Sequence, residues 1–415
     1  MASGAAILHT EYVDEPTKSK SPFFPGQPVP VEFFVGRADQ VNRILQRGAG
    51  QVASGKPVSI FVEGEYGIGK SSLVTFTQRL AEKKYKLLPI YVTLGGCKSM
   101  DDVAARTVEC TLIAGGHEST RGEKLRNWLA KYVGEQGLFG FKINLQALKT
   151  DAPDFSSPQG MLAFFEEAVK RLSDEGVAGI FLVFDEINGI VGDPGFSMFL
   201  KSFVDENGVR REPVPLLLAL CGTDDKRREM IQRHKPVDRI FDVIHVDAMS
   251  DSEMDEFFTS AFKSVGISVE PGALVLFRVF SAGLPKIMQM LGDSAYWIDR
   301  DANIDREDVG QAAFATAEDV GRKFVDQQVF NALRSEKYQA ILDIIGQQAP
   351  LEMSFVRGDI MASLSDVQQK VFDNFLQRMR QLNVIRQGER KGEYVFNVLM
   401  VRYYIYITAQ RRKAQ

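Results

Sequence analysis

The stretch FVEGEYGIGKSSLV, residues 61–74, carries the most informative pattern in this sequence of 415 residues. Its middle, from Gly64 to Ser71, fits the phosphate-binding pattern G-x-x-x-x-G-K-[ST] at every position. The glycines allow backbone N–H groups to turn toward phosphates, and the helix that follows presents its N-terminus to their negative charge. An apolar run precedes the pattern and a helical run follows it. The sequence therefore predicts an ATP-binding loop between a strand and a helix.

Two side chains of this loop are predicted to act on the nucleotide and its metal. Lys70 would bridge the β- and γ-phosphates, and the hydroxyl of Ser71 would hold Mg²⁺. Gly64 and Gly69 supply the backbone freedom that the loop needs. ATP and Mg²⁺ are therefore the predicted cofactors.

A second motif, GIFLVFDE at residues 179–186, ends an apolar strand in two carboxylates. Asp185 can reach Mg²⁺ through a water, and Glu186 can act as the general base that polarises the attacking water. The alternative is an ordinary strand followed by an acidic loop. Because a P-loop lies upstream, the acidic pair favours hydrolysis over binding alone.

Short apolar runs alternate with helical runs between residues 57 and 247. The five predicted strands are VSIFVEG, KLLPIYVTLGG, AGIFLVFDE, VPLLLALCGT and RIFDVIHV. Continuous apolar runs separated by helices are typical of buried parallel strands. The predicted fold is a doubly wound α/β domain with a five-stranded parallel P-loop sheet.

The rest of the chain is predicted to be organised around this core. The predicted parts are an extended N-terminal arm at 1–30, the α/β core at 31–249, an all-helical lid at 250–330 and a winged helix-turn-helix domain at 331–415. The residues SDSE at 250–253 predict a capping box that starts the lid, after which no strands are expected until the last hairpin. Residues 115–160 predict an inserted strand or hairpin, with Phe139, Phe141, Ile143 and Leu145 alternating; it is either buried or an interaction surface.

Composition limits the class of protein. Charged residues make up 25% and hydrophobic residues 45% of the chain, as in ordinary globular proteins. No apolar run is long enough for a membrane span, and we expect no signal peptide. The 3 cysteines and 4 histidines form no disulfide or metal pattern. A cytoplasmic protein without its own metal cluster is the expectation.

Two further residues are candidates for the hydrolytic site. Thr223, in CGTDD at the end of a core strand, could contact the γ-phosphate or the water, or it could simply cap the following helix. Arg239, before the last core strand, could reach a neighbouring subunit's γ-phosphate as an arginine finger, or form a surface salt bridge. The residues alone leave both pairs of alternatives open.

Together these stretches resemble the AAA+ ATPases, in the origin-recognition-like and STAND-like branch. The resemblance covers residues 22 to about 405 and implies that 64–72 form Walker A, with Tyr66, Gly67 and Ser72 also at the nucleotide. It implies that Asp185 and Glu186 form Walker B and that Thr223 is sensor 1. It places Phe34, Val35, Gly36 and Arg37 at the adenine pocket and Pro285 and Lys286 in sensor 2.

Two positions depart from the pattern of the family. Sensor 1 has Gly-Thr where origin-recognition proteins usually show Asn, and sensor 2 has Lys286 in place of Arg. Both departures favour slow turnover, with ATP acting as a conformational switch.

The C-terminal segment is the one part of the chain whose charge favours a polyanion. Residues 331–415 contain 13 Lys+Arg and 8 Asp+Glu, a net charge of +5, against −9 for the rest. Polar and basic side chains on one face of its third helix are of the type that contacts bases and phosphates. The DNA-contact candidates are Lys370, Arg378, Arg386, Arg390 and Lys391. The alternative is a winged helix that docks a protein or packs structurally.

The leading hypothesis is therefore an AAA+ ATPase switch that couples its nucleotide state to double-stranded DNA. The alternative is a STAND-like signalling or scaffold ATPase, in a defence or mobile-element system, that acts on a separately encoded protein partner. A third hypothesis is a ring-forming loader that self-associates through ATP-bridged interfaces, with Arg239 acting in trans.

Overall fold

The computed structural model describes residues 18, 20–26, 34–115, 119–133, 138–139, 142–143, 154–330, 335–382 and 384–414. Two compact units are present. Residues 26–253 and 283–286 form the first, called the sheet unit below. The described residues within 1–25, 254–282 and 287–415 form the second, called the helical unit. The predicted winged-helix region lies in the helical unit together with most of the predicted lid, whose residues 250–253 and 283–286 belong to the sheet unit.

The sheet unit is built on a five-stranded sheet in the order β2-β5-β6-β1-β7. Its strands are β1 (Val58–Glu63), β2 (Leu87–Thr93), β5 (Gly179–Asp185), β6 (Leu216–Gly222) and β7 (Asp242–His245). All four neighbouring pairs are parallel. The prediction of a five-stranded parallel sheet is confirmed, and its strands β5 and β6 are buried along their whole length.

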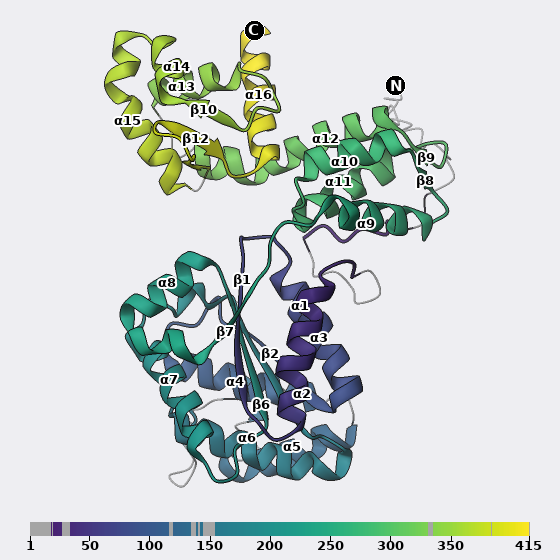
Figure 1. Cartoon of the computed structure of the whole chain (residues 1–415), viewed down its shortest axis with the longest axis vertical. Helices are drawn as coiled ribbons and strands as arrows, with labels where there is room; N and C mark the ends of the chain where they lie inside the picture. The colour runs from purple at the N-terminus through teal and green to yellow at the C-terminus, as the bar shows by residue number, and fades with distance from the viewer. Residues whose placement is uncertain are drawn as a thin grey trace, which may run out of the picture. The chain divides into compact units, whose positions relative to one another are not determined.

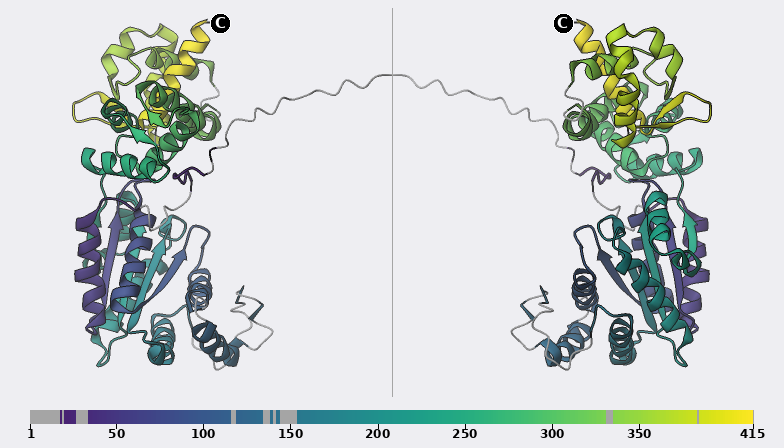
Figure 2. Two further views of the ribbon diagram at one scale, coloured as in Figure 1. Left: turned by 90° about the vertical axis from the view of Figure 1, so that its right-hand side faces the viewer. Right: turned by 90° about the vertical axis from the view of Figure 1, so that its left-hand side faces the viewer.

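Helices cover both faces of this sheet (Figures 1 and 2). One face packs on α1 (Ala38–Arg43), the π-helical turn η2 (Ile44–Ala49), α2 (Gly50–Ala53) and α3 (Lys70–Tyr85). The other face packs on α4 (Met100–Gly115), α6 (Pro158–Leu172), α7 (Pro194–Val209) and α8 (Asp224–Arg233), while α5 (Ser119–Val133) packs outside α4 and α6. Short 3₁₀ turns lie at η5 (Ser173–Glu175), η6 (Ile187–Gly189) and η7 (Lys235–Ile240).

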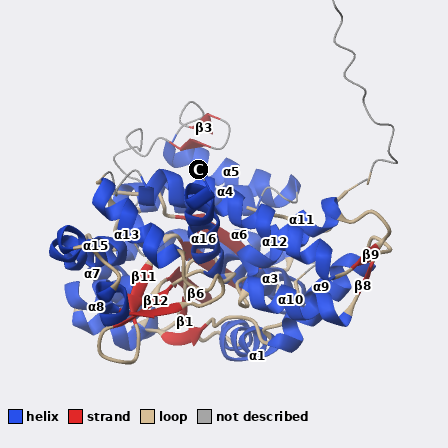
Figure 3. Cartoon of the chain, turned by 90° about the horizontal axis from the view of Figure 1, so that it is seen from above, coloured by secondary structure: helices blue, strands red, loops and turns tan. Residues whose placement is uncertain are grey.

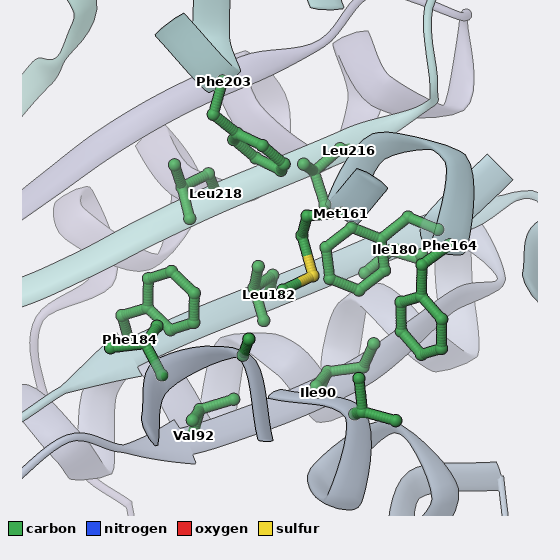
Figure 4. Close-up of a cluster of buried hydrophobic side chains, with 14 of the residues drawn as sticks. Ile90, Val92, Met161, Phe164, Ile180, Leu182, Phe184, Phe203, Leu216 and Leu218 are labelled. Carbon is green, nitrogen blue, oxygen red and sulfur yellow. The ribbon is translucent and has the colours of Figure 1, made fainter. Parts of the chain in front are cut away.

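The core on the second face of the sheet is almost entirely aliphatic and aromatic. Figure 4 shows its centre, where strand residues meet Met161, Phe164 and Phe203 from the covering helices. Strand β5 is buried along its whole length, which places it in the sheet interior. Helix α7 lies in a region for which no helix is predicted above. Asp193 accepts a hydrogen bond from the Gly195 backbone N–H, and Pro194 follows it, a start signal that the sequence does contain.

The segment predicted as an insertion is only partly described. Its described hairpin is short, with β3 (Leu138–Phe139) antiparallel to β4 (Lys142–Ile143). Phe141 and Leu145 lie outside the described residues. In the preceding helix α5, Trp128 stacks on Phe164 of α6 with ring centroids 5.3 Å apart. The packed part of this segment is therefore helical and joins the core of the sheet unit.

The first part of the helical unit is built from α9 (Asp251–Lys263), α10 (Pro271–Ser281), α11 (Pro285–Ile298), α12 (Arg306–Val320) and the π-helical η8 (Gly321–Phe330). The first residues of α9 and of α11 belong to the sheet unit. The predicted capping box is confirmed, since Glu253 Oε2 accepts the backbone N–H and hydroxyl of Ser250. The expectation of no strands is wrong in this region. Two short parallel strands, β8 (Ser268–Val269) and β9 (Asn303–Ile304), pair beside α9 and α10 (Figure 3). A two-residue strand is too short to leave a periodic pattern.

The expected N-terminal arm needs a correction at Phe23. Its ring is buried and lies 5.0 Å, centroid to centroid, from Phe262 of α9. The backbone N–H of Phe24 also donates to Gln289 of α11 at 2.7 Å. Residues 20–26 have no helix or strand but are packed into the helical unit, because the ring of Phe23 is buried without regular structure.

The remaining elements are α13 (Glu336–Gly346), β10 (Ser354–Val356), α14 (Arg357–Ala362), α15 (Asp366–Gln381), β11 (Ile385–Gln387), β12 (Glu393–Phe396) and α16 (Leu399–Ala414). The sheet order is β10-β12-β11, and both pairings are antiparallel. Strand β10 lies before the hairpin, where no strand is predicted above. Helices α13, α14 and α15 and the β11–β12 hairpin are present as expected, and α16 follows the hairpin. Their function as a winged helix stays a prediction.

Helix α16 is fixed to this region by a buried arginine. Arg402 is 1% exposed, and its guanidinium donates to the carbonyl oxygens of Gln348, Ala349 and Glu352. Burial lowers its pKa from the ordinary value of a guanidinium to about 10. Within the described part of the chain, no helix has both the length and the apolar character of a membrane span.

Candidate nucleotide-binding site

The loop predicted to bind phosphates joins β1 to α3. Gly67 and Gly69 have φ angles of +78° and +93°, in the left-handed region that glycine adopts at low cost. At Gly64, an added Cβ would lie 2.5 Å from the carbonyl oxygen of Val246, so a larger residue would push the loop from its neighbour. Helix α3 starts at Lys70, and no side chain caps its N-terminus. The loop therefore has the backbone that a phosphate site requires.

Lys70 points back into the loop. Its Nζ donates to the carbonyl oxygens of Gly64 at 2.9 Å and Glu65 at 2.8 Å. Burial lowers the pKa of this ammonium, an effect that nearby Cys221 and Asp185 oppose. The two carbonyls hold a cation at the centre of the loop, where a triphosphate would supply stronger acceptors.

The two predicted metal-holding residues are in direct contact. The hydroxyl of Ser71, in the first turn of α3, donates to Oδ2 of Asp185 at 2.6 Å. Oδ1 of Asp185 accepts the backbone N–H of Glu186 at 2.8 Å. The residues are 114 positions apart and meet because β5 ends at the same edge of the parallel sheet as β1. A serine hydroxyl and a carboxylate are the oxygen ligands that Mg²⁺ prefers.

Glu186 lies beside this contact in an unusual backbone conformation. Its φ is +55°, a region that non-glycine residues seldom adopt and that is often found at functional sites. Its carboxylate lies over Gly95, in the loop after β2, where an added Cβ would be 2.4 Å from Oε2. Glu186 is therefore held against a glycine that leaves room for it.

Thr223 and Arg239 take different positions. Thr223 follows β6, the strand between β1 and β5, and stands at the N-cap of α8 without a side-chain cap bond. Its hydroxyl is thus not used for the helix cap. Arg239 is exposed on η7, and among the described residues no hydrogen bond or ion pair joins it to Lys70, Ser71 or Asp185.

The residues expected at the adenine pocket, 34–37, lie just before α1 and make contacts within the sheet unit. Phe34 stacks on Phe76 of α3 with ring centroids 4.3 Å apart. Val35 is half-buried, and Gly36 has a φ of +76° with the carboxylate of Glu253 against it. The guanidinium of Arg37 is buried and donates to the carbonyl oxygens of Ile68, inside the phosphate loop, and Asp247.

Pro285 and Lys286, the first two residues of α11, lie against the phosphate loop. The backbone N–H of Lys286 donates to the carbonyl of Gly67 at 3.3 Å, and Pro285 lies against Gly69. The ammonium of Lys286 is 5.0 Å from the ring centroid of Tyr66, which is 75% exposed. The structure thus brings the segment resembling sensor 2 together with the phosphate loop. Ser72 is half-buried in the first turn of α3.

Two side chains at this edge of the sheet, Tyr91 and Glu63, were not predicted from the sequence. Tyr91 of β2 donates from its hydroxyl to Oδ2 of Asp185. Glu63, at the end of β1, pairs with Arg227 of α8 at 2.5 Å, and Arg227 also contacts Asp238 at 2.8 Å. No short motif marks these residues, since their contacts depend on which strands are neighbours.

The predicted DNA-contact residues belong to the helical unit. Lys370 and Arg378 are exposed on α15, and the other three, Arg386, Arg390 and Lys391, are exposed in or beside the β11–β12 hairpin. Asp373, on the exposed side of α15, is paired with Arg357, whose Nε and Nη2 lie 2.8 and 3.0 Å from its two oxygens. This pair reduces the acidic charge on a face whose other charges are mainly basic.

The residues of the site fit a Mg²⁺ ion that is bound together with a nucleotide. Among the residues that the structure describes, no group of three or more His, Cys, Asp and Glu could hold a metal ion by itself. Mg²⁺ is commonly bound through one or two protein oxygens together with substrate phosphates. Ser71 and Asp185 supply that number of side chains, at the end of the loop that is predicted to bind phosphates.

Comparisons with known proteins agree with this geometry. Residues 34–218 match the model of the AAA ATPase domain. No curated protein sequence matches the chain. Among solved structures, the Walker-type ATPase PABY2304 of Pyrococcus abyssi is 15% identical, with a TM-score of 0.54 over 90% of this chain and 96% of that one.

Two other similar structures are an ORC1 protein and a Cdc6p protein. ORC1 of Aeropyrum pernix, solved in complex with DNA, is 14% identical, with a TM-score of 0.47 over 92% of this chain and 95% of that one. Cdc6p of Pyrobaculum aerophilum is 11% identical, with a TM-score of 0.48 over 94% and 98%. Of these three TM-scores, the one for the P. abyssi structure exceeds 0.5, and at 15% identity it shows a shared fold. Residues 34–218 thus match the AAA ATPase domain in sequence, and the chain shares the fold of a P-loop ATPase.

Proposed function

We propose that the sheet unit binds Mg²⁺–ATP and hydrolyses it slowly, and that the nucleotide state controls the binding of the helical unit to DNA. One observation carries the first half of this proposal: the hydrogen bond from Ser71 to Asp185 at the start of α3. It joins the two motifs that must act on one metal and one triphosphate.

The residues of the site divide the reaction between them. Lys70 and the backbone N–H groups of the loop would bind the phosphates, and Ser71 and Asp185 would hold Mg²⁺. The metal, when bound, neutralises charge on the phosphate oxygens. Glu186 would accept a proton from the attacking water as the water oxygen bonds to the γ-phosphorus and the bond to the β-phosphate oxygen breaks. ADP and inorganic phosphate are the products.

Slow turnover follows from the residues at the two sensor positions. Thr223 offers a single hydroxyl where an amide could both donate and accept. Lys286 presents its ammonium to the exposed ring of Tyr66, and it lacks the forked geometry with which arginine binds phosphate. A site of this kind binds ATP well but stabilises the transition state weakly, which suits a switch.

The switch would act through the chain at Pro285 and Lys286. These residues belong to the sheet unit and contact the phosphate loop, and the rest of α11 belongs to the helical unit. A nucleotide that binds more tightly to one arrangement of this segment would shift the population toward it.

The hydrolytic half is tested with two substitutions and a control. Lys70→Ala should abolish ATP binding, whereas Glu186→Gln should retain binding and stop turnover. Lys83→Ala, an exposed change on the same helix, should resemble the wild type. Calorimetry measures binding, and phosphate release measures turnover. If Glu186→Gln hydrolyses ATP at the wild-type rate, the general base is not Glu186.

The DNA half is tested separately by gel shift with random duplex DNA, with ATP and without. Binding should weaken steeply with salt, because Lys and Arg contacts release counterions from the phosphates. Lys370→Ala and Arg378→Ala should each lower the salt slope by about one unit, and Lys323→Ala, on η8, should not. Absence of binding at low salt would reject DNA and favour a protein partner.

A further inference from the structure

The phenol of Tyr91 lies in the candidate site but belongs to none of its sequence motifs. Its hydroxyl donates a hydrogen bond to Oδ2 of Asp185, the oxygen that also accepts the hydroxyl of Ser71. The second oxygen, Oδ1, accepts the backbone N–H of Glu186 at 2.8 Å. Three donors from different parts of the sheet unit therefore fix one carboxylate at both of its oxygens.

The register of the sheet explains why residue 91 can make this contact. Tyr91 is paired with Val183, and Thr93 is paired with Asp185. Residues two apart on a strand point to the same face, so Tyr91 lies on the face from which Asp185 projects. Two residues span ~6.6 Å along a strand, a distance that a tyrosine side chain covers. Tyr91 also packs against the apolar cluster under α3, which holds its ring in place.

The hydroxyl of Tyr91 remains a donor at physiological pH. Burial raises its pKa most, and the charge of Asp185 and the hydrogen bond to it raise the pKa further. A protonated phenol can orient a carboxylate, whereas a phenolate beside Asp185 would be repelled by it.

We propose that Tyr91 is a positioning residue for Mg²⁺, which acts by holding the carboxylate of Asp185 in the orientation that serves the metal. This inference rests on the proposed function, since it assumes a Mg²⁺–nucleotide at Ser71 and Asp185. Groups that hydrogen-bond to metal-holding side chains typically account for about 10–100-fold in metal affinity. Tyr91 affects the metal only through Asp185, so nucleotide affinity without metal should not depend on it.

The experiment uses the full chain and the substitution Tyr91→Phe, which removes one oxygen and keeps the ring. A fluorescent ATP analogue is first titrated in EDTA, and Mg²⁺ is then titrated at a fixed nucleotide concentration. We expect an unchanged affinity in EDTA and a half-saturating Mg²⁺ concentration raised by about 10–100-fold. Tyr85→Phe is the matched control, because Tyr85 is on α3 of the same unit with its hydroxyl beside Gly50.

A second comparison separates positioning from a general loss of structure. Tyr91→Phe is repeated in an Asp185→Ala background, where it should no longer change the Mg²⁺ dependence, because coupled residues are not additive. An unchanged Mg²⁺ half-saturation in Tyr91→Phe overturns the proposal, as does an equal loss of affinity in EDTA. If the wild type binds no nucleotide with or without Mg²⁺, the proposed function itself fails.

Discussion

The contrast between two arginines at the ends of α1 provides a demanding test of how the phosphate loop is held. Arg37 is 6% exposed, and its Nη2 donates to the carbonyl of Ile68 at 2.6 Å and to that of Asp247 at 3.1 Å. Arg43 pairs with Asp242 at the surface, where the two side chains are 40% and 39% exposed. Arg37→Met and Arg43→Met remove the same charge from these two environments.

The expected loss for Arg37→Met follows from its two bonds. Hydrogen bonds to charged groups contribute about 1.5–3 kcal/mol each, so the gross loss is about 3–6 kcal/mol. Burial lowers the pKa of Arg37, so the buried charge carries a desolvation cost that methionine avoids. We expect a net loss of about 2–3 kcal/mol in the free energy of unfolding of the sheet unit. The surface pair should contribute less than about 1 kcal/mol.

Nucleotide binding should respond as well. Ile68 lies between Gly67 and Gly69. Without the hydrogen bond to its carbonyl the loop has more conformational entropy, which is lost when ATP binds. A cost of 1.4 kcal/mol corresponds to about ten-fold weaker ATP binding in Arg37→Met.

The assay can isolate the sheet unit because each unit contains one of the two tryptophans. Trp128 is buried in the sheet unit, and Trp297 is 55% exposed in the helical unit. Urea unfolding in a Trp297→Phe background, followed by fluorescence, therefore reports on the sheet unit, and calorimetry gives ATP affinity. If Arg37→Met and Arg43→Met lose similar stability, or if ATP affinity is unchanged in Arg37→Met, the buried contact does not hold the loop.

Two further predictions concern neighbouring groups. Gly95→Ala places a Cβ against the carboxylate of Glu186. It should lower turnover by about 10–100-fold without changing ATP affinity, since a small displacement of a reacting group has effects of this size. Steady-state phosphate release measures turnover, and Gly208→Ala, where nothing lies within 4 Å of the added Cβ, is the control. The substitution Glu253→Gln should change how the free energy of unfolding depends on pH. Burial raises the pKa of Glu253, but hydrogen bonds from Arg37 and Ser250 outweigh this and lower it below its ordinary 4.5. Its stabilisation, about 1 kcal/mol for a capping side chain, should be complete above pH 4.5 and disappear as pH falls through the lower folded-state pKa. Urea unfolding between pH 7 and pH 3 should show the two proteins converging at acid pH, and a constant difference would contradict the assignment.

The sequence by itself determined the local features of this protein. The phosphate loop, the apolar strand that ends in Asp185, and the capping box at Ser250 were all predicted, because each is made by residues close together in the chain. Phosphate binding uses consecutive backbone N–H groups, a buried strand needs a continuous apolar run, and a cap involves residues three positions apart. Helix α7 was missed although the pair Asp193–Pro194 marked its start.

Only the tertiary structure decided which distant residues meet. The strand order β2-β5-β6-β1-β7 and its register place Ser71 beside Asp185, 114 positions away, and Tyr91 on the same carboxylate from 94 positions away. Backbone hydrogen bonds between strands do not depend on side-chain identity, so several apolar runs could have become neighbours. The packing of the helices on the two faces selects one order, and that order gives Tyr91 and Arg37 contacts that no local pattern of the chain specifies.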